Sequence, residues 1–184
     1  YLAENYNLYR SLQIFDIFEA EFGSKTQEKI TKVVSISGNA QWFFSAYYNV
    51  FLNSKLNPNW QKPDVLCMTA YVGGDHLKGS DPDLLTKFKQ VVDDTCTELK
   101  VTKEKAEELG LRLGTYEGGQ HLLDGADIFS RSPIAYEAYT YLLDNFSQYY
   151  EFITHYAHCG TPASWGAWVA KHYTGEPLED AHRY

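Results

Sequence analysis

The chain has 184 residues, in which 16 lysines and arginines stand against 24 aspartates and glutamates for a formal charge of -8. Aromatic residues make up 16% of the chain, which excludes a disordered segment and can supply a sizeable core. The acidic balance and the lack of a Lys/Arg cluster argue against a nucleic-acid binder, and no apolar run approaches the roughly 18 residues of a membrane span. We therefore expect one soluble domain over residues 1–184.

The start of the chain and its cysteines add two expectations. The sequence begins at Tyr1 instead of Met and shows no signal peptide, which suggests that something upstream was removed or is not represented. The three cysteines, Cys67, Cys96 and Cys159, are far apart and lack C-x-x-C spacing. This pattern indicates neither a disulfide scaffold nor a thiolate zinc site, and we expect no cofactor.

Helical and strand patterns alternate along the chain. Apolar residues recur every three or four positions from Leu8 to Phe22, before Gly23, and predict a helix over 3–22. β-branched runs predict strands, whereas capping residues and prolines mark the later helix starts. The further elements expected are a strand over 30–37, a helix capped by Asn39, a strand over 64–71, a long helix from Asp81 and Pro82, a short helix over 103–108, a strand over 111–116, a helix over 132–149 and a strand over 151–156.

This alternation of helices and strands is typical of parallel βαβ units, so the predicted class is α/β. Two architectures fit: a small doubly wound parallel sheet, or part of a (β/α)8 barrel. A complete barrel takes about 250 residues, and four strands with their helices are half of one. We therefore expect residues 1–184 to form the C-terminal half of a barrel, strands five to eight, with the small doubly wound sheet as the alternative.

The second and third predicted strands end in the same pattern, Y-x-G-G-x-H-L, at residues 71–77 and 116–122. Paired glycines just past a strand allow a sharp turn and leave room at the carboxyl edge, where both candidate folds bind ligands. The copies differ at their second position, Val72 in one and Glu117 in the other. Only Glu117 can act as an acid, base or nucleophile, although it could instead cap the loop or pair with Arg112.

The region after the fourth predicted strand holds two tryptophans, Trp165 and Trp168. Tryptophan rings beside a catalytic edge are suited to stacking against sugar faces, and their alternative role is core packing. Trp42 and Trp60 are open to the same two interpretations.

Several stretches together resemble the C-terminal half of clan A (β/α)8 glycoside hydrolases, in which the nucleophilic Glu ends the seventh strand. The resemblance looks closer to poorly characterised large secreted bacterial proteins labelled cellulose-binding. The matching stretches are residues 11–18, 69–71, 112–122 and 164–168, of which Y-E-G-G-Q-H-L is the most specific. In that group an Asn-Glu pair at the end of the fourth strand supplies the acid/base, and this chain contains no Asn-Glu pair.

The resemblance implies a retaining glycoside hydrolase-like domain that acts on or binds a β-linked polysaccharide outside the cell or at its surface. It makes Glu117 the nucleophile, with Tyr71 or Tyr116 hydrogen-bonded to it and keeping it ionised. The acid/base carboxyl would come from the missing N-terminal barrel half, and that half or another chain would cover the open sheet edges. The residues expected to contact sugar are Gln41, Trp42, Asp75, Gln120, His121, His155, Trp165 and Trp168.

Two other interpretations stay open. One is a non-catalytic glycan-binding or structural module that keeps the barrel and its aromatics but lacks the acid/base pair. The other is a metal hydrolase, because strand-end histidines and carboxylates can converge on a metal ion. Its residues would be His76, His121, His155, His158, Asp75 and Glu117, but they show neither H-x-H nor H-E-x-x-H spacing.

Overall fold

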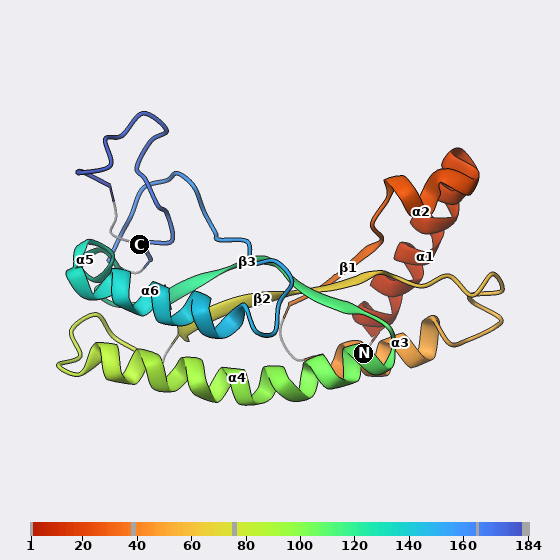
Figure 1. The fold of residues 1–184 in the computed structure, drawn as a ribbon, viewed down its shortest axis with the longest axis horizontal. Helices are drawn as coiled ribbons and strands as arrows, with labels where there is room; N and C mark the ends of the chain where they lie inside the picture. Colours follow the sequence, from red (N-terminus) through yellow and green to blue (C-terminus); the bar gives the residue numbers. More distant parts are fainter. Residues whose placement is uncertain (1, 38–39, 75–76, 165, 182–184) are drawn as a thin grey trace. The chain divides into compact units, whose positions relative to one another are not determined.

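The computed structural model describes residues 2–37, 40–74, 77–164 and 166–181. It shows an α/β fold with an open, all-parallel sheet of three strands in the order β1-β2-β3 (Figure 1). The elements in chain order are α1 (Leu2–Phe22), η1 (Gly23–Lys25), α2 (Thr26–Lys29), β1 (Val33–Ile36), α3 (Ala40–Val50), β2 (Val65–Gly74), α4 (Leu84–Glu108), β3 (Arg112–Leu122), α5 (Ala126–Arg131) and α6 (Pro133–Phe146). The small parallel sheet that was the alternative prediction fits this structure.

The chain divides into two compact units. The first contains residues 1–68 and 104–114, and the second contains residues 69–103 and 115–184. The boundaries fall within β2, α4 and β3.

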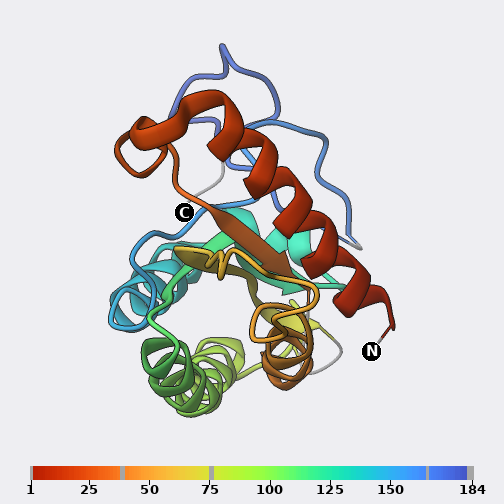
Figure 2. The same ribbon diagram turned by 90° about the vertical axis from the view of Figure 1, so that its right-hand side faces the viewer.

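In the first unit, α1 packs against α3 and β1 (Figure 2). The helix forms as the sequence predicts, and its stripe of Leu8, Leu12 and Phe15 is buried. Phe15 meets Phe51 with ring centroids 6.3 Å apart, and Phe51 stacks on Tyr47 at 5.0 Å. β1 and β2 pair in parallel from Val33 with Val65 to Ile36 with Met68. Aromatic burial therefore holds the helices of this unit on its part of the sheet.

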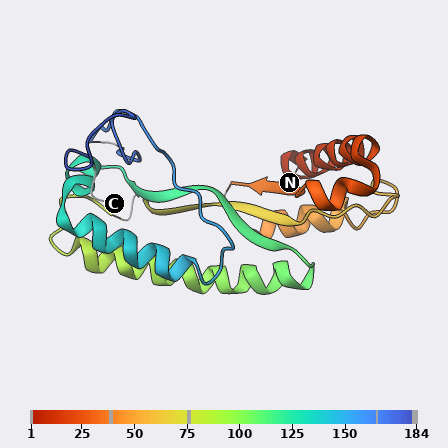
Figure 3. The same cartoon turned by 45° about the horizontal axis from the view of Figure 1, so that its top comes forward.

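In the second unit, α6 runs beside the first part of α4 (Figure 3). Lys89 forms an ion pair with Glu137 at 2.6 Å, and the Tyr141 hydroxyl donates a hydrogen bond to Asp93 at 2.7 Å. The core beneath these contacts contains Phe88, which stacks on Phe129 of α5 with centroids 6.0 Å apart. The apolar residues Leu84, Phe88, Val92, Cys96 and Leu99 of α4 are buried and form the face of this helix that packs.

The fourth predicted strand, residues 151–156, is not a β-strand. The segment still runs along β3: the Thr115 N–H donates to Phe152 O at 3.1 Å, and the Tyr156 N–H donates to Gly118 O at 2.9 Å. Between these contacts the Thr154 N–H donates to the Thr115 side-chain oxygen at 2.7 Å instead of a main-chain carbonyl. A side chain thus replaces one backbone partner, and no regular ladder forms.

Two helix predictions also need correction. Residues 103–108 are the end of α4 and not a separate helix, because no glycine or proline interrupts the chain between Leu99 and Glu108. α5 was missed because its six residues are too few to show a helical period. The expected cap Asn39 lies outside the described residues.

The expected strand ends are wrong as well. β2 continues to Gly74 and β3 to Leu122, so Tyr71 and Glu117 lie within their strands and not at the ends. The glycines belong to the strands: Gly73, Gly74 and Gly119 have φ values of 131°, 65° and 138°. These are conformations that side-chain-bearing residues rarely adopt, and glycine adopts them without a steric penalty.

Within the described ranges, none of the helices has the length and apolar character needed to cross a bilayer.

Candidate functional site

Glu117 is a half-buried carboxylate within β3, and it interacts with a tyrosine of the neighbouring strand. The Tyr71 side chain on β2 forms a hydrogen bond with Glu117. Burial raises the pKa of the Tyr71 phenol, and the charge of Glu117 and this hydrogen bond raise it further. Tyr71 is therefore protonated at neutral pH and donates a hydrogen bond to the carboxylate. The structure thus brings together two residues that the sequence singled out separately.

His121 lies between two aromatic rings in the same unit. Its ring centroid is 5.2 Å from that of Tyr71 and 5.6 Å from that of Trp168, the latter in a T-shaped arrangement. His121 and Trp168 are both half-buried. The residues Glu117, Tyr71, His121 and Trp168 are called the Glu117 cluster below. It combines a carboxylate, a phenol and two further rings, drawn from β2, β3 and the C-terminal segment.

The glycines of the repeated motif allow β2 and β3 to approach closely in this unit. A Cβ atom on Gly73 would lie 2.8 Å from His121 O, and one on Gly118 would lie 2.6 Å from Ala70 O. Gly73 therefore lies beside His121 and not beside Gly118, its counterpart in the second copy of the motif. The two copies have the same residue pattern, but their corresponding residues do not lie opposite each other in the sheet.

A second group of polar contacts surrounds Gly119. The Gln120 N–H donates to the Tyr139 hydroxyl oxygen at 3.0 Å, and this hydroxyl lies 3.2 Å from His155 Nε2. Burial lowers the pKa of His155, so its ring is neutral at neutral pH and its Nε2 shares one hydrogen bond with the Tyr139 hydroxyl. A Cβ on Gly119 would lie 3.2–3.3 Å from the His155 ring, which is close enough to disturb it. His155 is thus tied to β3 by a specific network.

Gln120 has a structural role and is not placed to bind sugar. Its side chain is completely buried. The amide nitrogen donates to Ala167 O at 2.5 Å, and the amide oxygen accepts the Leu122 N–H at 2.8 Å. Because both ends of the amide are used inside the protein, Gln120 anchors the segment that carries Trp168.

The other predicted site residues are distributed as follows. Tyr116 is 37% exposed, and burial followed by the charge of Glu117 raises the pKa of its phenol. Gln41 and Trp42 lie on α3 in the first unit, where Trp42 is 48% exposed. Asp75 and Trp165 lie outside the described residues, as does His76. The part of the chain that the structure describes contains no group of three or more His, Cys, Asp or Glu arranged to hold a metal ion.

Two residues of this region were missed by the sequence reasoning. Tyr139 lies in the apolar stripe of α6 and looks like an ordinary core residue, yet its hydroxyl contacts β3. Tyr156 contributes to raising the pKa of Tyr71 and therefore lies near the Glu117 cluster. No spacing in the sequence signals either contact, because both depend on how distant segments pack.

Comparison with known proteins gave no match: neither a family model, nor a curated protein, nor a solved structure is similar to this chain.

Proposed function

We propose that this chain belongs to a glycoside hydrolase-like protein that binds and cleaves a β-linked polysaccharide, with Glu117 as the nucleophile of a retaining reaction. The observation that supports this most directly is the hydrogen bond between Tyr71 and Glu117 beside the rings of His121 and Trp168. Carboxylate and phenol groups hydrogen-bond sugar hydroxyls, and aromatic rings stack on the apolar faces of sugars. The Glu117 cluster contains both kinds of group.

In the proposed reaction, a Glu117 carboxylate oxygen attacks the anomeric carbon and forms a glycosyl-enzyme ester. The bond to the leaving oxygen breaks as a second carboxylic acid protonates that oxygen. Water, deprotonated by the same second group, then releases the sugar and regenerates Glu117. Tyr71 donates a hydrogen bond to the nucleophile and fixes its orientation, whereas Trp168 provides a stacking surface.

A retaining enzyme holds its two carboxyl groups about 5 to 5.5 Å apart. We propose that the second group comes from outside these 184 residues, as in a (β/α)8 barrel of which this chain forms the second half. The order of the sheet supports this proposal, because β1 lies at its edge and a further parallel strand can pair there. The extended run of residues 152–156 beside β3 is also compatible with it. A secreted or cell-surface location belongs to the same proposal.

The alternative is a glycan-binding module without catalysis. It is favoured by one observation: within the described residues, Glu117 interacts with the phenols of Tyr71 and Tyr116 and not with a second carboxyl group. In this case Glu117 and Tyr71 hydrogen-bond the polysaccharide, and Trp168 stacks on it.

The test compares Glu117→Gln with a matched control in the full-length protein. Glu98→Gln makes the same chemical change on an exposed face of α4 in the same unit. Each variant is assayed for binding and hydrolysis of soluble β-glucan, xylan and mannan. We expect Glu117→Gln to abolish hydrolysis while binding and thermal unfolding stay unchanged, and Glu98→Gln to behave as the unmodified protein does.

The other outcomes separate the proposals. Binding without turnover in the unmodified protein would support the glycan-binding module. Hydrolysis that survives Glu117→Gln would reject Glu117 as nucleophile, and the absence of binding to all three polysaccharides would reject both proposals.

A further inference from the structure

The loop over residues 57–61, in the first unit, holds a tryptophan in an unusual backbone conformation. Trp60 has φ of 51°, and its side chain is 57% exposed. A residue with a side chain rarely occupies this left-handed region, and doing so costs roughly 1 to 2 kcal/mol. The strained backbone at Trp60 is therefore not compensated by burial of the indole.

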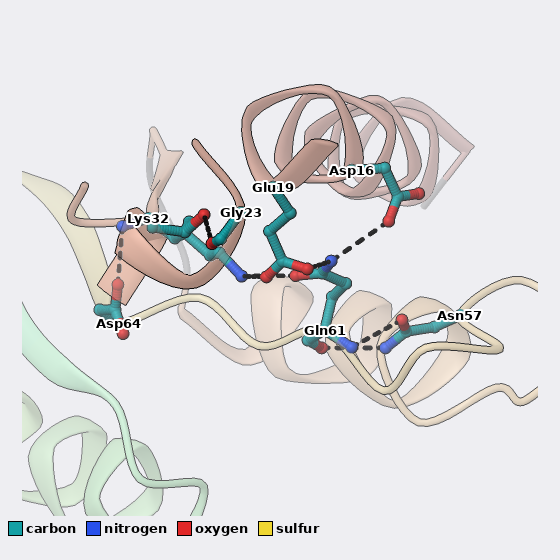
Figure 4. Close-up of polar contacts among 8 residues, drawn as sticks. Asp16, Glu19, Gly23, Lys32, Asn57, Gln61 and Asp64 are labelled. Carbon is teal, nitrogen blue, oxygen red and sulfur yellow. Dashed lines mark hydrogen bonds and ion pairs between the residues drawn. The ribbon is translucent and has the colours of Figure 1, made fainter. Parts of the chain in front are cut away.

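The buried Asn57 side chain fixes this loop (Figure 4). Its Nδ2 donates to Phe51 O at 2.8 Å and to Gln61 O at 2.9 Å, and its Oδ1 accepts the Gln61 N–H at 2.8 Å. The Trp60 N–H also donates to Asn57 O at 3.2 Å. These bonds on both sides of Trp60 determine its backbone conformation, so the exposed position of the indole is built into the fold.

Trp60 lines a pocket of about 620 Å³. This volume lies in the range of small-molecule sites, about 300 to 1,000 Å³. Among the described residues of the first unit, the other lining side chains come from α1, α2, the segments that lead into β1 and β2, and the first residue of β3. They are Glu19, Thr26, Gln27, Thr31, Lys32, Asn59, Gln61, Lys62, Asp64 and Arg112.

A polar network forms one wall of this pocket, with Lys32, Glu19 and Gln61 pointing toward one another (Figure 4). Lys32 forms an ion pair with Glu19 and donates to the Gln61 amide oxygen. The Gln61 amide nitrogen donates to Glu19 and, at 3.2 Å, to Asp16. Because Gln61 is only 5% exposed and its amide is fully used, this wall is rigid.

The charges of the lining favour a neutral ligand. The ammonium of Lys32 is already paired with Glu19, and one Asp64 oxygen accepts the Lys32 backbone N–H at 2.7 Å. The pocket lining thus carries cations and anions in similar number. A site for a charged ligand would instead be expected to carry charges of one sign. The remaining polar lining is rich in amides and hydroxyls, which both donate and accept hydrogen bonds.

We propose that this pocket binds a neutral saccharide, with one sugar ring stacked on the Trp60 indole and its hydroxyls hydrogen-bonded by Asn59 and Gln27. An exposed ring beside paired donors and acceptors matches a pyranose, which has an apolar face and a rim of hydroxyls. The left-handed backbone at Trp60 presents that ring. The site contains none of the Glu117 cluster and does not depend on the proposed hydrolytic function.

The experiment follows the tryptophan indole N–H signals in a proton–nitrogen correlation spectrum of the full chain. The chain has four tryptophans, and Trp60→Ala identifies one signal by its loss. Cellohexaose, xylohexaose and mannohexaose are titrated separately, and hexagalacturonate serves as an anionic probe of the same length. Tyr6→Ala is the matched control, because Tyr6 is also an exposed aromatic residue of the first unit and does not line the pocket.

We expect at least one neutral hexasaccharide to shift the Trp60 signal saturably. The Trp60 variants lack this signal, so their affinity for the same hexasaccharide is measured by calorimetry, and Trp60→Ala should bind it about tenfold or more weakly. Trp60→Phe, which keeps a ring, should retain part of the affinity, whereas Tyr6→Ala should leave the Trp60 shift unchanged. Three results would each overturn the proposal: no shift with any neutral probe up to about 10 mM, stronger binding of hexagalacturonate, or an unchanged affinity in Trp60→Ala. A Trp60 shift without hydrolysis would leave this site standing while the proposed function failed.

Discussion

Tyr71 on β2 donates a hydrogen bond to Glu117 on β3, so neighbouring strands share one polar pair. Both residues are half-buried, and the Tyr71 ring also contacts His121. A hydrogen bond to a charged group contributes about 1.5 to 3 kcal/mol. Tyr71 is therefore expected to position Glu117, and its removal should be measurable apart from any loss of folding.

Tyr71→Phe removes this hydrogen bond and keeps the ring. If Glu117 is the nucleophile, we expect the turnover of a β-linked polysaccharide to fall roughly 10- to 100-fold, with little change in binding or thermal unfolding. Tyr136→Phe, at a 65% exposed position on α6, is the matched control and should have no effect on turnover. Equal turnover in Tyr71→Phe and the unmodified protein would show that this bond does not act on the reaction.

The motif glycines provide a prediction that depends only on the fold. Gly73→Ala would place a Cβ 2.8 Å from His121 O at φ of 131°, whereas a Cβ on Gly74, at φ of 65°, meets nothing within 4 Å. We expect Gly73→Ala to lower the free energy of unfolding by about 3 kcal/mol or more, through strain and overlap together. Gly74→Ala should cost only about 1 kcal/mol, from its backbone conformation alone. Urea unfolding of both variants tests this difference, and equal losses would contradict the close approach of the strands.

The sequence predicted the alternation of helices and strands because those signals are local. The stripe from Leu8 to Phe15 predicts α1, and the β-branched run around Val34 predicts β1. The ends of β2 and β3 could not be predicted in the same way. Gly73 and Gly119 look like turn residues, and only the neighbouring strand shows that they are needed for close packing.

The candidate site was predictable to a similar extent. Glu117, Tyr71 and His121 were identified from a repeated motif, and the structure brings these three together. The same motif suggested Gln120 as a sugar ligand, but its partners are a carbonyl and an N–H that the sequence does not place beside it. Trp60 was open to sugar stacking or core packing, like Trp42, but its positive φ could not be predicted because it depends on the hydrogen bonds of Asn57.

The loop that carries Trp60 allows a test of whether this tryptophan contributes to the stability of the fold. Trp60→Gly places the residue best suited to φ of 51° and removes an indole that is 57% exposed. The relief of strain, about 1 to 2 kcal/mol, offsets the extra freedom of glycine in the unfolded chain, about 0.5 to 1 kcal/mol. Thermal unfolding should therefore show Trp60→Gly to be at least as stable as the unmodified protein. A clear loss of stability would mean that the indole is a structural part of the first unit.

Asn57→Ala tests the hydrogen bonds that fix the backbone of this loop. It removes a side chain that is 2% exposed and makes three hydrogen bonds to the backbone. We expect it to lower the free energy of unfolding by about 2 to 4 kcal/mol, because buried backbone groups lose their partners. Asn59→Ala changes the same residue type at an exposed position of the same loop and should cost less than about 0.5 kcal/mol. Similar losses in the two variants would contradict the role assigned to Asn57.

His155 predicts how stability depends on pH. Burial lowers the pKa of His155 below its ordinary value of 6.5. Below about pH 6.5 the unfolded chain binds a proton that the folded chain does not, so this contribution to stability is complete above that pH and is lost as the pH falls toward the folded pKa. The slope from one such group is at most about 1.4 kcal/mol per pH unit.

Urea unfolding between pH 5.0 and pH 7.5 measures this slope. The hydrogen bond from Lys32 lowers the pKa of Glu19 below 4.5. Glu19 therefore stays charged in the folded chain across this window and does not contribute to the measured slope. His155→Gln should flatten the pH dependence even though it lowers stability by removing the contact with Tyr139. The exposed His158 serves as the control, and His158→Gln should keep the full slope. A slope that survives in His155→Gln would show that its imidazole takes up a proton as readily in the folded protein as in water.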